Sequence, residues 1–158
     1  MLKRVLIFIG IIILLGLLSV YYPKLTGEED WKNKEYEKES CFVDRVIDGD
    51  TLVCNNDTIR LLGIDTSEKE EEYYQEAKDF LKQVEGKDVE ILRDWEDLGK
   101  YKRKLRYVFY EGRLINIEIL EKGLGKAFII EDLKYKDKIL IAEKFAKDNC
   151  LMVWVDSC

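Results

Sequence analysis

The chain has 158 residues with a net charge of −6, and it contains no histidine. This length is sufficient for one domain with a hydrophobic core plus shorter additional segments. The lack of histidine excludes Ser–His and Cys–His nucleophilic catalysis and histidine-based metal sites, so acid–base chemistry would depend on carboxylates, Lys, Tyr or Cys.

The N-terminal segment is far more apolar than the remainder of the chain. Lys3 and Arg4 precede 18 residues without charge, Val5 to Tyr22. A helix of that length extends for about 27 Å, close to the thickness of the hydrocarbon layer of a membrane. We therefore predict that residues 1–23 form a membrane anchor.

The expected anchor has a preferred orientation and one alternative. Because basic residues favour the cytosolic side, the sequence predicts a single-pass protein of the cell membrane, held through residues 5–22, with a cytosolic N-terminus and its domain outside. A cleaved signal peptide would instead release a secreted form. No alanine precedes Ala77 to form an A-x-A cleavage site, although Gly16 and Ser19 keep this alternative open.

Residues 24–40 differ in composition from both neighbouring segments. They read KLTGEEDWKNKEYEKES, which is mostly charged and contains three large apolar side chains. Because so few apolar groups cannot bury enough surface to fold alone, we predict a charged stalk, with a charged helix as the alternative. Residues 41–158 are then expected to form one globular domain.

The first part of this domain has the pattern of three strands. Residues 41–47, 51–54 and 58–64 are rich in apolar and β-branched residues, and the turn sequences DGDT at 48–51 and NND at 55–57 separate them. These strands are expected to pair consecutively as an antiparallel meander.

A helix is expected after the third strand. Ser67 and Glu70 match the capping-box sequence that begins many helices. Four apolar residues then recur at helical spacing: Tyr74, Ala77, Leu81 and Val84. Gly86 is a typical residue at a helix end.

The remaining expected elements are shorter. Residues 89–92 and 105–110 are predicted strands, and residues 116–121 and 139–146 are predicted helices. Five short strands with about three helices predict a mainly β domain with helices (α+β), an OB-fold barrel of five strands, preceded by the transmembrane helix. The pattern alone equally allows an unspecified α+β domain.

Four cysteines lie in the predicted domain: Cys41, Cys54, Cys150 and Cys158. An even number outside the cytosol suggests disulfides, and four cysteines allow three pairings. Their spacing does not resemble that of a zinc site. Cys54 lies in an apolar strand, where a buried free thiol is the alternative.

Two carboxylates are expected to converge in this arrangement. Asp50 begins the second predicted strand and Asp65 follows the third, and an antiparallel hairpin brings these two ends together. With the carbonyl of Thr66, they would form a site of hard oxygen ligands for Ca²⁺, whose other positions water can fill.

The neighbouring charged residues suit a phosphodiester substrate. Arg60 lies on the intervening strand, and Glu68 follows Asp65 closely. A cation and guanidinium groups offset the negative charge that develops on phosphate, and a carboxylate can take a proton from water. Taken singly, each residue has a simpler explanation as a turn, helix-cap, ion-pair or solvated surface residue.

Several segments resemble the staphylococcal nuclease (thermonuclease-like) family over residues 41–154. The main ones are IDGDT at 47–51, IRLLGIDTSE at 59–68 and KYKR at 100–103. Shorter matches follow: Tyr74, Glu76-Ala77, Asn116, Lys122-Gly123-Leu124, Ala146, Leu151 and Trp154.

The resemblance implies an OB-fold enzyme that hydrolyses DNA and RNA, cuts the bond to the 5′ oxygen and leaves 3′-phosphate ends. It implies that Asp50, Asp65 and the carbonyl of Thr66 bind Ca²⁺. Glu68 would activate the attacking water. Arg60 and Arg103 would together hold the phosphate.

The sequence departs from the family pattern at several places. Ser67 replaces a proline, Lys102 replaces a glycine, and the segment from Glu68 to Tyr73 is shortened. The substrate-stacking tyrosines have no clear equivalents around residues 128–130. Lys102 would be strained if its position requires a positive φ. In that case the second phosphate contact would be sought at a neighbouring basic residue, Lys100 or Arg106.

The charge predicts weak, salt-sensitive nucleic-acid binding, because the domain is acidic apart from a basic cluster at residues 100–106.

The main hypothesis is a membrane-tethered, calcium-dependent nuclease acting on single-stranded DNA and RNA. The alternative is a catalytically silent OB-fold module that binds nucleic acid or protein at the cell surface. A third possibility is a structural surface domain held by disulfides. No protein partner can be inferred.

Overall fold

The computed structural model describes residues 37–94, 97–130 and 132–157, and these belong to one compact unit. The predicted anchor at residues 1–23 and most of the predicted stalk at 24–40 lie outside the described residues. Within the described part of the chain, no helix is long and apolar enough to cross a bilayer.

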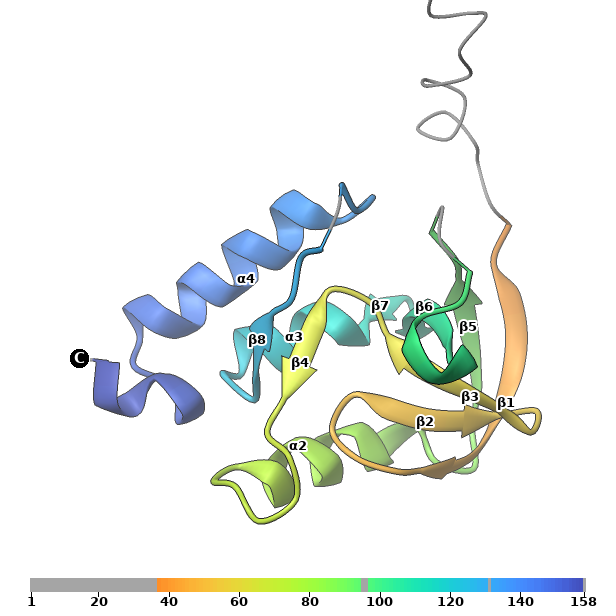
Figure 1. Cartoon of the computed structure of the whole chain (residues 1–158), viewed down its shortest axis with the longest axis horizontal. Helices are drawn as coiled ribbons and strands as arrows, with labels where there is room; N and C mark the ends of the chain where they lie inside the picture. Colours follow the sequence, from red (N-terminus) through yellow and green to blue (C-terminus); the bar gives the residue numbers. More distant parts are fainter. Residues whose placement is uncertain (1–36, 95–96, 131, 158) are drawn as a thin grey trace, which may run out of the picture. The chain divides into compact units, whose positions relative to one another are not determined.

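Five strands close into a barrel, which confirms the predicted OB-type architecture (Figure 1). They are β1 (Glu39–Val46), β2 (Thr51–Cys54), β3 (Asp57–Leu61), β5 (Asp88–Leu92) and β6 (Lys104–Tyr110). Their order is β3-β2-β1-β5-β6, and β3 pairs with β6 in parallel to close the ring. Closure leaves no open sheet edge among these five strands.

The first strand serves two partners because it bends. Its first half, residues 39–42, pairs with β5, and its second half, residues 43–46, pairs with β2. The register shifts between Val43 and Arg45, where a bulge lets the strand turn. β1 begins at Glu39, two residues inside the segment expected to be a stalk.

Helices and two small strand pairs surround the barrel (Figure 1). The helices are α2 (Tyr74–Leu81), α3 (Ile115–Glu121) and α4 (Lys136–Asp148), with 3₁₀ turns η1 (Lys82–Val84), η2 (Lys100–Lys102) and η3 (Met152–Ser157). β7 (Arg113–Leu114) extends β6, and β4 (Ile64–Thr66) pairs with β8 (Gly125–Ala127). α4 packs against α3 and β8.

The core is continuous from the barrel interior to the helices. Apolar residues of every barrel strand are buried, including Val43, Leu52, Ile59, Ile91 and Tyr107. Each helix adds its apolar face: Ala77 and Leu81, then Ile115, Ile119 and Leu120, then Ile139, Ala142 and Ala146. This packing makes the barrel a rigid support for the residues at its rim.

The third predicted strand, residues 58–64, is divided in the structure. β3 ends at Leu61, and Gly63 turns the chain with a φ of +76°, a conformation that glycine adopts without strain. The chain then forms β4, which leaves the barrel and pairs with β8. Asp65 and Thr66 therefore lie on a separate small strand.

The predicted capping box of Ser67 and Glu70 is wrong. α2 begins only at Tyr74, because Glu70 and Tyr73 have φ values of +79° and +64°, which a right-handed helix does not allow. The residues before the helix instead form a loop, in which the backbone N–H of Glu68 donates to the Glu71 carboxylate at 2.7 Å.

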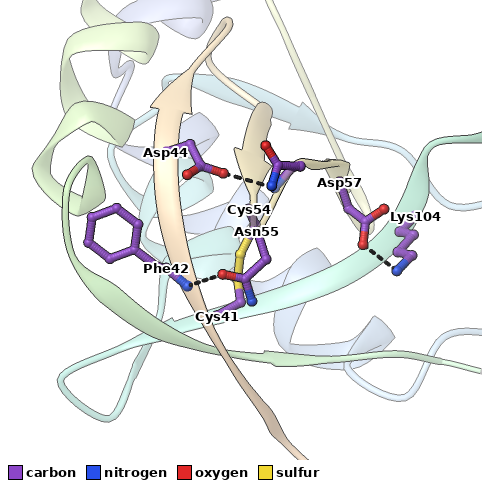
Figure 2. Close-up of a disulfide and its surroundings, with 8 residues drawn as sticks. Cys41, Phe42, Asp44, Cys54, Asn55, Asp57 and Lys104 are labelled. Atoms are coloured by element: carbon purple, nitrogen blue, oxygen red, sulfur yellow. Dashed lines mark hydrogen bonds and ion pairs between the residues drawn. A yellow bond between two sulfur atoms is a disulfide. The ribbon is translucent and has the colours of Figure 1, made fainter.

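A disulfide joins Cys41 of β1 to Cys54 of β2, with 5.8 Å between their Cα atoms (Figure 2). The alternative of a free thiol at Cys54 is therefore wrong. Both cysteines are buried, and the side chain of Asn55 accepts a 3.2 Å hydrogen bond from the backbone N–H of Phe42 beside them. Cys150 is disulfide-bonded as well.

Candidate active site

A cavity of about 550 Å³ lies at the rim of the barrel, beside β4. Its charged lining residues are Asp48, Asp50, Arg60, Asp65, Glu68, Asp94 and Arg103. The other wall is apolar and includes Leu62, Leu105, Phe128, Ile130 and Leu133. Five of these are the charged site residues predicted from the sequence: Asp50, Arg60, Asp65, Glu68 and Arg103. Thr66 is hydrogen-bonded to Asp50.

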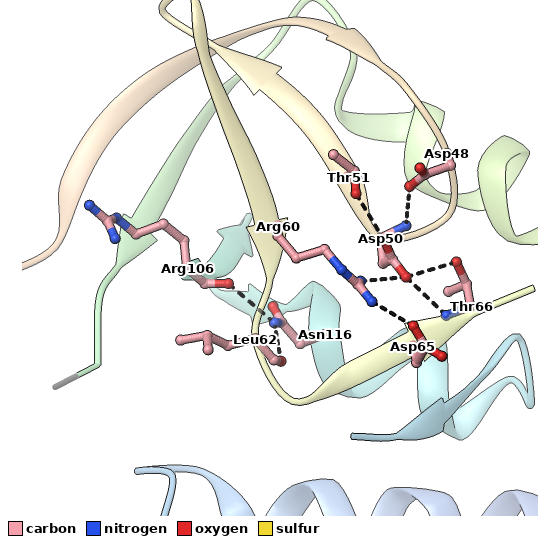
Figure 3. Close-up of polar contacts among 9 residues, drawn as sticks. All are labelled: Asp48, Asp50, Thr51, Arg60, Leu62, Asp65, Thr66, Arg106 and Asn116. Atoms are coloured by element: carbon pink, nitrogen blue, oxygen red, sulfur yellow. Dashed lines mark hydrogen bonds and ion pairs between the residues drawn. The ribbon is translucent and has the colours of Figure 1, made fainter. Parts of the chain in front are cut away.

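Asp50 is held at the turn between β1 and β2. One carboxylate oxygen accepts from the Thr51 hydroxyl at 2.9 Å, and the other accepts from the Thr66 N–H at 2.9 Å and the Thr66 hydroxyl at 3.1 Å (Figure 3). Gly49 permits this close approach, since a Cβ there would lie 2.6 Å from the Cβ of Ala77 and 2.7 Å from the Thr66 hydroxyl oxygen.

Arg60 connects the two predicted metal ligands. β2 and β3 pair so that Thr51 lies opposite Arg60, which places the guanidinium beside Asp50. One guanidinium nitrogen forms an ion pair with the Asp50 carboxylate, and the other lies 2.6 Å from the Asp65 carboxylate (Figure 3). The hairpin and the turn into β4 therefore bring Asp50 and Asp65 to the two terminal nitrogens of one guanidinium group.

The Asp50 carboxyl has an unusual pKa. Its burial raises the pKa from the ordinary 3.8 to about 6, because the charged form loses its hydration. The charge of Arg60 and the hydrogen bond from Thr66 lower the pKa and offset only part of that effect. Asp48, whose carboxylate accepts from the Asp50 N–H at 3.2 Å, adds further negative charge. The site therefore favours additional positive charge.

The donor set fits a hard divalent cation that retains water ligands. Asp50 and Asp65 offer carboxylate oxygens, and Asp48 adds a third negative charge, against the single positive charge of Arg60. In the described ranges, no three or more acidic or cysteine side chains converge into a complete metal cage. Such a sparse oxygen site suits Ca²⁺ or Mg²⁺ with water in the remaining positions.

Glu68 lies on the exposed loop that follows β4, at the edge of the cavity. Its loop contains Ser67, and two hydrogen bonds to Glu71 hold the loop. Besides the side-chain bond at its N–H, the carbonyl of Glu68 accepts from the Glu71 N–H at 2.9 Å. Glu71 thus restrains the loop that carries Glu68.

Arg103 follows η2 and enters the same cavity. Tyr101 and Lys102 precede it with φ values of +64° and +58°, so Lys102 has the positive φ that was considered above as a condition for strain. The Arg103 guanidinium carbon lies 5.8 Å from the centre of the Tyr101 ring. Its Nε is buried and has no hydrogen-bond acceptor among the described residues, which leaves this donor for an anionic ligand.

Arg106 does not provide the alternative phosphate contact considered from the sequence. Its side chain is 5% exposed and forms a 2.7 Å ion pair with Asp97. In Figure 3 its guanidinium points away from Arg60 and Asp50. The Arg106 guanidinium is therefore buried and paired with Asp97, so it is not available to bind phosphate.

Sequence reasoning missed several lining residues. Asp48 was treated as part of a turn, although a second aspartate two residues before Asp50 is a usable signal. Tyr101 was covered by the KYKR motif but given no role. Asp94 gave no local signal: it is buried and accepts a 2.7 Å hydrogen bond from the Tyr107 hydroxyl, which only the packing of β6 brings near.

Several known proteins are similar to this chain in sequence. A family model described as staphylococcal nuclease homologue matches residues 58–156. The thermonuclease of Staphylococcus intermedius is 30% identical over 160 residues, covering 92% of this chain and 95% of that protein. An uncharacterized endonuclease of Haemophilus influenzae is 31% identical, covering 77% and 69%. The thermonuclease of Staphylococcus hyicus is also 31% identical, covering 70% and 72%.

These similarities agree with the closed five-stranded barrel and the charged cavity at its rim. The family model covers Arg60, Asp65, Glu68 and Arg103, and thermonucleases generally depend on a metal ion. The chain therefore belongs to the staphylococcal nuclease family, and it is a nuclease.

Proposed function

We propose that this nuclease hydrolyses phosphodiester bonds of single-stranded DNA and RNA with Ca²⁺, outside the cytosol, while tethered to a membrane. The observation that carries the catalytic part is the position of Arg60 between Asp50 and Asp65, in one cavity with Glu68 and Arg103. This set combines acidic ligands, a carboxylate base and two guanidinium groups within reach of one phosphate.

Asp50, Asp65 and the carbonyl of Thr66 are the residues proposed to hold Ca²⁺. The ion would supply positive charge where negative charge develops on the phosphate. Asp50 is well suited to this, since its carboxylate is buried and its charge is only partly neutralised by Arg60. Two carboxylates and one carbonyl leave room for water ligands, as Ca²⁺ accepts.

Glu68 is proposed to take the proton from the attacking water. It lies at the exposed edge of the cavity, where solvent can reach it, and it carries no ion pair among those described. A carboxylate is the natural candidate for a general base near the metal ligands, because the chain has no histidine.

Arg60 and Arg103 are proposed to bind the phosphate from two directions. The buried Arg103 Nε lacks an acceptor among the described residues, so a phosphate oxygen would satisfy it. Arg60 is at present the counterion of Asp50 and Asp65. A divalent cation at these carboxylates would take over that role and leave the guanidinium available to the substrate.

The exposed apolar and aromatic side chains of the cavity support a single-stranded substrate. Three large side chains at its mouth are strongly exposed: Tyr101 at 76%, Ile130 at 75% and Phe128 at 51%. Unpaired bases can stack on or pack against such groups, whereas bases inside a duplex cannot reach them. With a net charge of −6, binding should be weak and sensitive to salt.

The proposed location rests on two features. The uncharged stretch from Val5 to Tyr22 has the length of a membrane helix. The disulfide between Cys41 and Cys54 suits an oxidising compartment, since such bonds are rare in the cytosol. N-terminal sequencing of protein extracted from membranes tests the anchor, and a mature protein that begins at or after Val20 would show a cleaved signal instead.

The catalytic proposal is tested with the purified full-length protein and an end-labelled single-stranded DNA. Cleavage is expected with Ca²⁺ and is expected to disappear with a chelator and in Asp50→Ala. A parallel incubation with duplex DNA of the same sequence measures the preference for single strands. Full cleavage after exhaustive chelation would exclude the metal role, and no cleavage under any condition would favour the silent binding module.

A further inference from the structure

A buried arginine, Arg106, contacts the beginning of the loop that carries Arg103. We define the Arg103 loop as residues 97–103, which precede β6. Arg106 on β6 is buried, and its guanidinium reaches the beginning of this loop. It lies 2.7 Å from the Asp97 carboxylate and donates to the backbone carbonyls of Leu105 at 2.8 Å and Asp97 at 3.4 Å.

Arg106 is itself fixed by the barrel. Its backbone carbonyl accepts from the Leu62 N–H at 2.9 Å and from the Asn116 side-chain amide at 3.4 Å, and that amide also donates to the Leu62 carbonyl at 2.9 Å (Figure 3). β3, α3 and β6 therefore meet at this residue. On this fixed backbone, one guanidinium nitrogen forms the ion pair with the Asp97 carboxylate and the other donates to two backbone carbonyls, so the side chain has little freedom.

The Arg103 loop requires such support because its backbone is strained. Tyr101 and Lys102 are consecutive non-glycine residues with φ values of +64° and +58°. Backbones of this kind persist only when surrounding contacts enforce them. The loop has backbone hydrogen bonds from Gly99 to Arg103 at 2.9 Å and from Leu105 to Asp97 at 3.0 Å, so its closure depends on where Asp97 lies.

We propose that Arg106 and Asp97 are positioning residues for catalysis, because their ion pair holds the strained turn that aims Arg103 into the cavity. Neither residue touches the substrate in this role. The inference rests on the proposed function of Arg103. It assigns Arg106 a purpose distinct from the phosphate contact, and it explains how a lysine at position 102 is compatible with a correctly placed Arg103.

The first test is a double-mutant cycle in the full-length protein, assayed well below the melting temperature of every variant. Asp97→Ala should lower kcat by about 10- to 100-fold, the loss typical of a catalytic group displaced by about 1 Å. In an Arg103→Lys background the same change should have almost no further effect on kcat, because the two residues act through one contact. Equal losses in both backgrounds would overturn the proposal.

The matched control is Glu118→Ala. The Glu118 carboxylate on α3 accepts hydrogen bonds at 2.9 Å and 3.0 Å from the guanidinium of Arg113 on β7. Neither residue lines the cavity. Removing this carboxylate also breaks an arginine pair and should leave kcat within about twofold. A comparable loss of kcat in Glu118→Ala would show that Asp97 acts only through general stability.

The second test is rescue by glycine. Lys102→Gly removes the steric cost of a positive φ, so the loop would need less support from Asp97. The double variant Asp97→Ala/Lys102→Gly should therefore recover a large part of the kcat lost in Asp97→Ala. A structural role for Asp97 without any effect on the turn predicts no recovery, and that result would contradict the inference.

A spectroscopic readout separates this inference from the proposed function. The Nε–H signal of Arg103, identified by its disappearance in Arg103→Lys, should shift in Asp97→Ala and stay in place in Glu118→Ala. If the wild-type protein cleaved no nucleic acid while this shift occurred, the proposed function would fail and the positioning role would stand. An unchanged signal in Asp97→Ala would reject the positioning role whatever the activity.

Discussion

The guanidinium of Arg60 lies against the buried carboxylate of Asp50, so the residue expected to bind phosphate is the present counterion of a residue expected to bind metal. Asp65 is bound to the same guanidinium at 2.6 Å. Cation binding and substrate binding are therefore linked through Arg60, because a metal ion that takes these carboxylates leaves the guanidinium for the phosphate.

The dependence of cleavage on Ca²⁺ should change with pH near 6. Burial raises the pKa of Asp50 to about 6, so this carboxyl is ionised above that pH and protonated below it. Only the ionised form binds metal, and protons then compete with Ca²⁺. The Ca²⁺ concentration for half-maximal activity should be constant above about pH 7 and rise about tenfold per unit below pH 6. A requirement that stays constant from pH 5 to 7 would contradict this.

Glu68→Gln should remove the general base while keeping the size of the side chain. We expect kcat to fall by about 100- to 10,000-fold with little change in KM, since proton transfer is made only in the transition state. Single-turnover cleavage of an end-labelled strand measures this directly. Glu72→Gln is the control, because Glu72 is an exposed carboxylate of the same acidic segment that does not line the cavity.

Arg103→Lys should keep the charge but lose the two-pronged contact with phosphate. The expected loss is about 100- to 1,000-fold in kcat, corresponding to about 2.7–4 kcal/mol for one such donor. Arg60→Lys sets the scale for the other arginine. Arg113→Lys, an exposed arginine on β7, should leave kcat unchanged. If Arg103→Lys changed only KM, and that change disappeared with salt, Arg103 would be a general basic contact.

Cys41→Ser/Cys54→Ser should destabilise the folded domain. The disulfide joins two cysteines 13 positions apart and encloses the turn with Asp50, and removing a native disulfide from a small domain typically costs about 2–5 kcal/mol. Urea unfolding followed by fluorescence measures the loss. A reducing agent should lower the stability of the wild type more than that of the double variant, which keeps only the disulfide of Cys150. Equal stability of wild type and variant would show that the β1–β2 pairing alone holds this hairpin.

Local sequence patterns determined much of the barrel. Alternating apolar residues and turn sequences located β1, β2, β5 and β6 within one or two residues, because apolar alternation and turn chemistry are local features of the chain. The helices α3 and α4 were located in the same way but extend further than expected. The short segments shared with the nuclease family identified the charged residues that line the cavity.

Local patterns failed where distant parts of the chain determine the backbone. Ser67 and Glu70 match a capping box, yet that segment folds as a loop between β4 and α2. The end of β3 was misplaced because the pairing of β4 with β8 involves residues more than fifty positions apart. Such pairing energies are invisible to any window of neighbouring residues.

The sequence by itself determined which chemical groups this nuclease has: carboxylates, arginines and no histidine, in an order that suits a metal-assisted attack on phosphate. Only the tertiary structure decided how each group is used. Arg103 and Arg106 belong to one basic cluster in the sequence, but one enters the cavity and the other is buried against Asp97. The reason is physical: the direction of a side chain and its loss of hydration depend on how strands and loops pack around it, and residue type specifies neither.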